Sequence, residues 1–154
     1  MTPEDKLLAM GIVLPEAGPP LGSYVPWVRT GNLIYLSGIL PLVGQRLLFS
    51  GRLGESVGTE DGAAAARQAA VNALAVLKHA LGSLDKVSKI IRLTGYVASA
   101  PDFSDQPAVL NAASDLLAEV FGESGRHTRV AVGAAALPKG ACVEIDLVIE
   151  VRGD

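Results

Sequence analysis

The stretch Val143-Glu144-Ile145-Asp146-Leu147-Val148-Ile149-Glu150-Val151 alternates aliphatic residues with residues that are mostly acidic. Successive side chains of a β-strand point to opposite faces of a sheet. This period of two therefore predicts a strand, over residues 141–151, with one apolar face and one mostly acidic face. The apolar face has to be buried against another layer of structure. The stretch predicts a sheet that is covered on one side.

Two long segments of the chain carry helix signals. One helix is predicted to begin at a capping Thr59, followed by acidic residues that suit the positive end of the helix dipole. It runs through alanine-rich sequence to about Leu81, where Gly82 stops it. A second helix is predicted from residues 102–107 to about Phe121. Two long helices against one sheet make a two-layer α+β domain.

The other strands are predicted from β-branched, aromatic and aliphatic runs that turn residues separate. They cover residues 24–29, 33–37, 46–52, 87–97 and 128–132. The last two strands, 128–132 and 141–151, are predicted to form a hairpin through residues 137–140. With a short helix capped by Thr2, the predicted order is α-βββ-α-β-α-ββ, in a mixed sheet with both long helices on one face.

Residues 1–154 are expected to form one domain, because this length suits a single hydrophobic core. Residues 1–22 would supply the N-terminal helix and a connector with three prolines, which neither a helix interior nor a central strand accepts. No helix is left for the other face of the sheet. We expect that face to be apolar and to be buried by oligomerisation.

The composition favours an intracellular protein with a small-molecule partner. The net charge of −3 supplies none of the phosphate attraction that nucleic-acid binding needs. The single cysteine, Cys142, and an N-terminus without a basic region before an apolar run indicate a reducing cytosol. Charged and polar residues interrupt the longest apolar stretch, within residues 63–81. We therefore expect a cytoplasmic protein that binds neither nucleic acid nor membranes.

Sequence motifs for metals, nucleotides and hydrolytic nucleophiles are missing. The chain has only two histidines, His79 and His127, and neither C-x-x-C nor H-x-x-x-H occurs. A phosphate-binding loop, a dinucleotide fingerprint and a G-x-S-x-G nucleophile elbow are also missing. We expect no metal site and no cofactor.

Arg129 and Glu144 stand out because the predicted last hairpin would pair them. Arg129 lies among short apolar residues, where a guanidinium facing an apolar wall needs an anionic partner. One interpretation is an ordinary cross-strand ion pair, or two side chains that point into water. In the other, Arg129 holds a substrate carboxylate in a bidentate fork while Glu144 orients a water molecule or moves a proton. The pair alone does not decide between them.

Further motifs occur in a fixed order along residues 22–151. They are Tyr24, the run Gly31-Asn32-Leu33-Ile34-Tyr35-Leu36-Ser37-Gly38-Ile39-Leu40-Pro41, Ala66-Arg67-Gln68 with Asn72, Asn111, Arg129, Leu137-Pro138 and Glu144. In this order and spacing the chain resembles the Rid/YjgF family, whose members are also named for an L-PSP endoribonuclease activity. The run 31–41 is similar to the family's G-N-x-I-x-x-S-G-x-x-P. Residues 133–136 and the N-terminal helix resemble a longer branch of that family.

The resemblance implies a chorismate-mutase-like protomer in a homotrimer, with ligand clefts between neighbouring subunits. It implies cofactor-free hydrolysis of reactive enamines and imines, such as 2-aminoacrylate, to 2-oxo acids and ammonia. Within the resemblance, Arg129 would bind the carboxylate and Glu144 would position the attacking water. The ligand would be held by the backbone at Gly38 and Ala131, in a cleft shaped by Tyr24 and Asn111. The protein needs mainly to orient the imine and to supply water, because an imine carbon is already electrophilic.

The residues after Arg129 depart from the resemblance. Many deaminase-type members carry Ser-Cys or Ser-Thr there, whereas this chain has Val130-Ala131, which keeps only a backbone amide. A non-catalytic sensor of 2-oxo acids in the same cleft is therefore an alternative to the deaminase. A ribonuclease is a weaker alternative, because the chain has a negative net charge and no interleaved basic and aromatic stripe.

Overall fold

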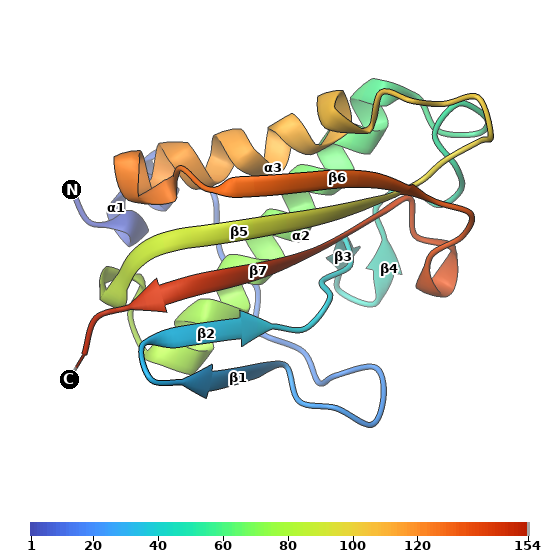
Figure 1. Ribbon diagram of the computed structural model, residues 1–154. Helices are drawn as coiled ribbons and strands as arrows, with labels where there is room; N and C mark the ends of the chain where they lie inside the picture. The colour runs from blue at the N-terminus through green and yellow to red at the C-terminus, as the bar shows by residue number, and fades with distance from the viewer. Residues whose placement is uncertain (154) are drawn as a thin grey trace.

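The computed structural model describes residues 1–153 of the chain. Within this range five strands form one sheet in the order β1-β2-β7-β5-β6 (Figure 1). They are β1 (Trp27–Thr30), β2 (Leu33–Leu36), β7 (Val143–Val151), β5 (Val87–Ala98) and β6 (Thr128–Ala134). β5 and β6 run parallel, and the other neighbouring pairs run antiparallel. The predicted mixed sheet is confirmed.

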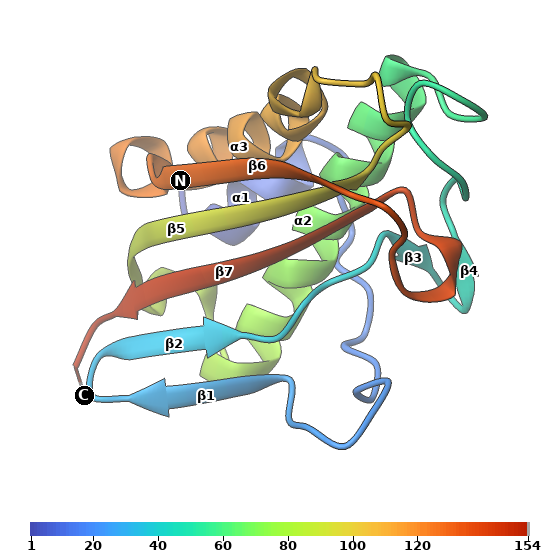
Figure 2. The same cartoon turned by 45° about the vertical axis from the view of Figure 1, so that its right-hand side comes forward.

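Helices α2 (Thr59–Leu81) and α3 (Gln106–Phe121) cover one face of the sheet, as Figures 1 and 2 show. α2 approaches the sheet with a row of fully buried small side chains: Ala65, Ala66, Ala69, Ala70 and Ala73. Opposite them lie the buried aliphatic residues of β7, which are Val143, Ile145, Leu147, Ile149 and Val151. The predicted two-layer α+β arrangement is confirmed, and the apolar face of β7 is the covered one.

The helix ends follow local chemistry. Helix α1 (Pro3–Ala9) begins with a capping box, in which the Thr2 hydroxyl accepts from the Asp5 amide at 3.0 Å and the Asp5 carboxylate accepts from the Thr2 amide at 2.9 Å. α2 ends at Gly82, whose left-handed backbone (φ 81°) lets its amide bond to the last turn. The predicted cap at Thr59 is wrong by one residue, because Gly58 is the N-cap and no side chain caps α2.

The predicted strand over residues 46–52 is mostly wrong. Only Arg46–Leu47 forms a strand, β4, which pairs with β3 (Leu42–Val43) in a separate two-stranded ribbon, and Ser50 makes a single bridge to Ala141. The chain leaves the extended conformation soon afterwards, since Phe49 and Gly51 have positive φ angles of 62° and 118°. A strand cannot continue through left-handed residues.

The predicted hairpin of the last two strands is also wrong. β6 pairs only with β5, in parallel, whereas β7 lies between β5 and β2. A parallel pair needs a long crossover connection, and α3 supplies it between β5 and β6. β7 then takes the free edge of β5. Residues 137–140 are therefore a connection across the end of the sheet, with a 3-10 turn at Pro138–Gly140, and not a hairpin turn.

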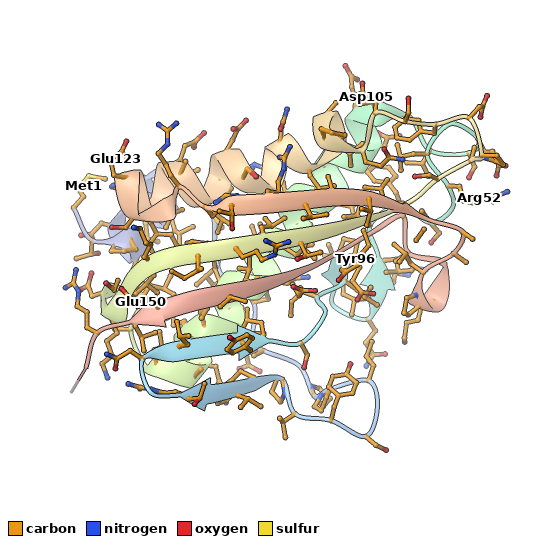
Figure 3. All side chains as sticks on the ribbon, in the orientation of Figure 1. Met1, Arg52, Tyr96, Asp105, Glu123 and Glu150 are labelled. Carbon is orange, nitrogen blue, oxygen red and sulfur yellow. The ribbon has the colours of Figure 1, made fainter. Side chains whose placement is uncertain are left out.

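The uncovered face of the sheet is mixed, which corrects the expectation of an apolar face. It carries the half-buried acids Glu144, Asp146 and Glu150 of β7. Tyr96 of β5 donates a hydrogen bond to Asp146 on this face at 3.1 Å, and Figure 3 shows Tyr96 and Glu150 in front of the sheet, on the side away from α2. Apolar side chains remain there as well, such as Val132 and Tyr35, with 41% and 47% of their surface exposed.

Candidate functional site

Arg129 lies on the helix-covered face of the sheet, at its β6 edge. It is opposite Leu93, which is fully buried beneath the helices, and paired residues of neighbouring strands share a face. The Arg129 guanidinium Nη1 donates to Asn111 Oδ1 at 2.9 Å and to Ser114 Oγ at 3.2 Å, both on α3. The structure thus brings together two of the predicted site residues, Arg129 and Asn111. Ala131 lies two residues further along β6, half-buried, opposite Gly95.

His127 is linked to Arg129 through Ser114. The Nδ1 atom of His127 is 2.6 Å from the Gly125 carbonyl oxygen, and its Nε2 atom is 2.9 Å from Ser114 Oγ. A carbonyl oxygen only accepts, so Nδ1 donates to Gly125, and in the tautomer with a proton on Nδ1 alone Nε2 accepts from the Ser114 hydroxyl. The Ser114 oxygen is then free to accept from Arg129. The hydrogen-bonded chain Gly125–His127–Ser114–Arg129 holds the guanidinium in place without a carboxylate.

Ser114 and His127 were missed as site residues from the sequence. Their spacing carried a signal, because Asn111 and Ser114 are three residues apart and share one face of a helix. His127 and Arg129 are two residues apart, which places both on one face of an extended segment. Only the packing of α3 over β6 joins the two pairs.

Glu144 lies on the uncovered face of the sheet. It is opposite Tyr96, three positions along β5 from the partner of Arg129. Gly38, which follows β2, lies directly against it, and a Cβ atom at Gly38 would overlap the carboxylate, 3.0 Å from Glu144 Cδ. Burial raises the pKa of the Glu144 carboxyl, and the nearby Asp146 charge raises it further. The predicted residues Gly38 and Glu144 therefore form a second group.

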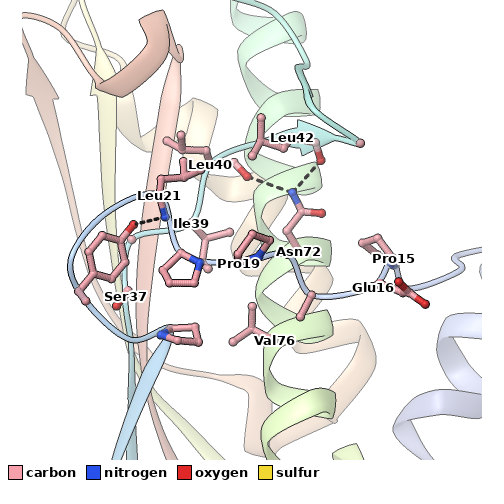
Figure 4. Close-up of a pocket in the computed structure, with 17 residues that line it drawn as sticks. Pro15, Glu16, Pro19, Leu21, Ser37, Ile39, Leu40, Leu42, Asn72 and Val76 are labelled. Carbon is pink, nitrogen blue, oxygen red and sulfur yellow. Dashed lines mark hydrogen bonds between the residues drawn. The ribbon is translucent and has the colours of Figure 1, made fainter.

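Tyr24 belongs to the second group through Gly38. It lies in a bend before β1, because the predicted strand over 24–29 begins only at Trp27. Its hydroxyl accepts a hydrogen bond from the Leu21 amide at 3.3 Å. Ser37 donates to the Val25 carbonyl at 2.6 Å and holds this bend against the end of β2. Tyr24 and Gly38 line one cavity, whose lining residues are drawn in Figure 4.

The two groups do not meet within one protomer. The partners of Arg129 and Glu144 on β5, Leu93 and Tyr96, are an odd number of residues apart, so their side chains point to opposite faces. Among residues 1–153 no carboxylate forms an ion pair with Arg129. The interpretation of Arg129 and Glu144 as a cross-strand ion pair is therefore wrong.

The raised pKa of Glu144 predicts how stability changes with pH. The folded state holds the proton more tightly than the unfolded state does. The stabilising contribution is therefore complete below the usual pKa of 4.5 and is lost as the pH rises through the raised pKa. Glu144→Gln cannot ionise, so its free energy of unfolding should gain on wild type as the pH rises from 4.5 through the raised pKa of Glu144.

Denaturant unfolding of both proteins across this pH range measures the difference. Glu119→Gln, at an exposed position of α3, is the control and should follow wild type. Parallel curves for Glu144→Gln and wild type would contradict the assignment.

Residues 1–153 contain neither a metal-binding group of side chains nor a helix that could span a membrane. No three side chains of His, Cys, Asp and Glu gather there into a group that could hold a metal ion. In the same range, every helix is too short or too polar to cross a membrane.

This arrangement, a mixed sheet under two helices with strand β7 inserted between β2 and β5, places the protein in the chorismate-mutase-like class of α+β folds. The chain belongs to the family described as "YjgF/chorismate mutase-like, putative endoribonuclease", whose model matches residues 4–151. The family resemblance of the sequence is thereby confirmed.

Three proteins are similar to this chain over most of its length. Protein TCP17 of Trypanosoma cruzi is 43% identical over 147 residues, which cover 95% of this chain and 92% of that protein. The 2-iminobutanoate/2-iminopropanoate deaminase of Dermatophagoides farinae is 31% identical over 142 residues, 92% of this chain and 95% of the relative. A crystal structure of an Agrobacterium tumefaciens protein of unknown function superposes with a TM-score of 0.92 at 44% identity, covering 97% of this chain and 92% of that one.

Proposed function

We propose that this protein hydrolyses imines of 2-oxo acids, including the imine that forms from 2-aminoacrylate, to the 2-oxo acid and ammonia. The observation that carries the proposal is the environment of Arg129. Its guanidinium is oriented by the neutral oxygens of Asn111 and Ser114, so its positive charge stays available for a ligand carboxylate. The deaminase name of the relative from Dermatophagoides farinae supports the same chemistry.

The proposed site lies between neighbouring protomers of a homotrimer. Arg129 and Asn111 lie at the β6 edge, and Glu144, Gly38 and Tyr24 belong to the other face and the β2 end. A closed ring of identical subunits presents one patch of each protomer to a different patch of the next. Such a ring can complete three clefts at once. The half-exposed apolar residues of the uncovered face supply surface for this contact.

The proposed reaction needs one water molecule and no cofactor. Arg129 holds the carboxylate, and the backbone at Gly38 and Ala131 holds the rest of the ligand. The water oxygen bonds to the imine carbon as one of its protons passes to the Glu144 carboxylate, and the nitrogen takes up a proton from solvent to give a carbinolamine. Glu144 then returns its proton to the amine nitrogen, the C–N bond breaks, ammonia leaves, and the hydroxyl proton is lost to solvent as the carbonyl forms. Burial raises the pKa of the Glu144 carboxyl, which makes its carboxylate a better proton acceptor than an exposed one.

A coupled assay tests the function. A pyridoxal-phosphate dehydratase acting on serine releases 2-aminoacrylate, and addition of this protein should accelerate the appearance of pyruvate. Light scattering on the same preparation should give the mass of three chains. A confirmed trimer that leaves the rate of pyruvate formation unchanged would remove the deaminase proposal.

A second candidate function is the binding of 2-oxo acids without turnover. The observation that favours it is Val130-Ala131, which offers no hydroxyl or thiol beside the arginine. Calorimetry with pyruvate separates the two candidates. Binding without acceleration in the coupled assay would support the sensor, whereas acceleration supports the deaminase.

Ser114 offers a test of how the arginine is held. We expect Ser114→Ala to weaken pyruvate binding about tenfold, because a hydrogen bond to a charged group contributes roughly 1.5–3 kcal/mol. The change also leaves His127 Nε2 without its donor. Ser104→Ala, at an exposed serine before α3, is the matched control and should bind like wild type. Unchanged affinity in Ser114→Ala would remove Ser114 from the support of Arg129.

A further inference from the structure

Ser114 and His127 form a hydrogen-bonded pair that takes no direct part in the proposed imine hydrolysis. The Ser114 hydroxyl oxygen lies 2.9 Å from His127 Nε2, and His127 Nδ1 lies 2.6 Å from the Gly125 carbonyl oxygen. A hydroxyl within hydrogen-bond reach of a base that a third group orients is the signature of an activated nucleophile. Both side chains are half-buried, and the neighbouring Asn111 is exposed, so a ligand can reach the pair.

The backbone fixes the histidine relative to the serine. Ser114 belongs to α3, and Gly125 ends the 3-10 turn Gly122–Gly125 that follows this helix. Gly125 is buried so closely against α3 that a Cβ atom there would overlap the Leu117 carbonyl. The carbonyl group that orients His127 is therefore anchored to the helix that carries Ser114. Groups on packed elements keep their relative geometry better than groups on loops do.

Arg129 places a positive charge next to the serine hydroxyl. Its Nη1 atom donates to Ser114 Oγ at 3.2 Å and to Asn111 Oδ1 at 2.9 Å. A guanidinium has five N–H groups, and these two bonds leave those on Nε and Nη2 for an anionic ligand. A carboxylate in that position would be bound beside the hydroxyl oxygen of Ser114. The nucleophile and the anion-binding group are thus neighbours.

We propose that Ser114 is a nucleophile that takes up the acyl group of esters with a carboxylate close to the ester bond, with His127 as its general base and Arg129 as the holder of the carboxylate. All three side chains come from one protomer. This esterase activity goes beyond the proposed imine hydrolysis, because it needs neither Glu144 nor an imine.

The reaction has two steps that together consume one water molecule. The Ser114 oxygen bonds to the ester carbonyl carbon as its proton passes to His127 Nε2, and Nε2 then gives that proton to the alcohol oxygen as the C–O bond breaks. Water attacks the acyl carbon next and gives a proton to Nε2, which returns it to the Ser114 oxygen as the carboxylic acid leaves. Throughout, the Nδ1 proton stays hydrogen-bonded to the Gly125 carbonyl, which orients the imidazolium that forms in each step.

Acetylsalicylate tests the proposal, because its carboxylate lies next to an acetyl ester, and phenyl acetate is the neutral counterpart. The wild-type protein should release salicylate, and acid quenching followed by peptide mass spectrometry should place one acetyl group on Ser114. Relative to the uncatalysed rates, acetylsalicylate should react faster than phenyl acetate. Arg129→Ala should remove this preference and keep most of the reaction with phenyl acetate, since only the carboxylate needs the guanidinium.

Variants of the pair separate a nucleophile from a structural contact. Ser114→Ala should remove the acetylated site, and His127→Gln should slow acetylation at least about a hundredfold, since a positioned general base contributes roughly 10²–10⁴-fold. Ser104→Ala and His79→Gln, at exposed positions away from the pair, are the matched controls and should react like wild type.

The outcomes distinguish this inference from the proposed function. A wild-type protein without an acetyl group on Ser114, or an unchanged rate in His127→Gln, would overturn the inference and leave the pair as a support of Arg129. Acetylation of Ser114 in a protein that hydrolyses no imine would support the inference and remove the proposed function.

Discussion

Arg129→Ala is expected to abolish imine hydrolysis and to weaken binding of 2-oxo acids at least about thirtyfold. Truncating one partner of a hydrogen-bonded charge pair costs about 2–5 kcal/mol, and here the other partner is the ligand carboxylate. The change leaves Asn111 and Ser114 at half-exposed or exposed positions where water replaces the guanidinium. The coupled assay gives the loss in kcat/KM, and calorimetry with pyruvate gives the loss in affinity.

A neighbouring arginine provides the control for this variant. Arg126 is 71% exposed at its side chain and forms only a loose ion pair with Glu123 at 3.6 Å. Arg126→Ala should keep wild-type activity and affinity, since such surface pairs contribute little. Arg129→Lys should bind at an intermediate level, because lysine keeps the charge but lacks the planar fork. If Arg129→Ala loses its helical circular dichroism or dissociates into monomers, Arg129 is a structural residue and the functional assignment loses its main support.

Regular structure was predictable where its signals are local. The alternation of residues 143–151 predicted β7, and the acidic start, alanine run and Gly82 predicted α2 almost to its ends. Strand pairing is different, because the partner of a strand is chosen by the whole fold. Residues 128–134 and 143–151 are neighbours in sequence, yet α3 directs the first to β5 and leaves β7 to the opposite edge of β5. No local pattern distinguishes that outcome from a hairpin.

The same limit applies to the candidate site. The resemblance implied one cleft that contains Arg129, Glu144, Gly38, Ala131, Tyr24 and Asn111. Of these residues the structure joins Arg129 and Asn111 by a hydrogen bond. Ser114 and His127 were missed because their contact depends on how α3 packs over β6. The pairing of Arg129 with Glu144 was expected because the last two strands were predicted to form a hairpin. These strands are not neighbours in the sheet, and the two side chains lie on opposite faces. The role of Gly38 in ligand binding stays a prediction, and the structure shows that any side chain at this position would strike Glu144.

The family description contains the word endoribonuclease, which would lead one to expect that this chain cleaves RNA. The net charge is −3, and the uncovered face carries Glu144, Asp146 and Glu150. Such a surface repels a phosphate backbone, whereas a single oriented guanidinium suits one small carboxylate. The chemistry proposed above therefore agrees with the charge distribution better than RNA cleavage does.

We infer that each cleft combines Arg129 of one protomer with Glu144 of the next. Co-expression of Arg129→Ala and Glu144→Gln chains under two different affinity tags, followed by purification on both, yields only mixed trimers. In a closed ring, each mixed trimer contains one cleft with both wild-type residues, so activity should return to roughly one third of wild type. Each variant alone should be inactive. If the mixed trimers are as inactive as their parents, the two residues do not act together across the subunit contact, and the account is contradicted.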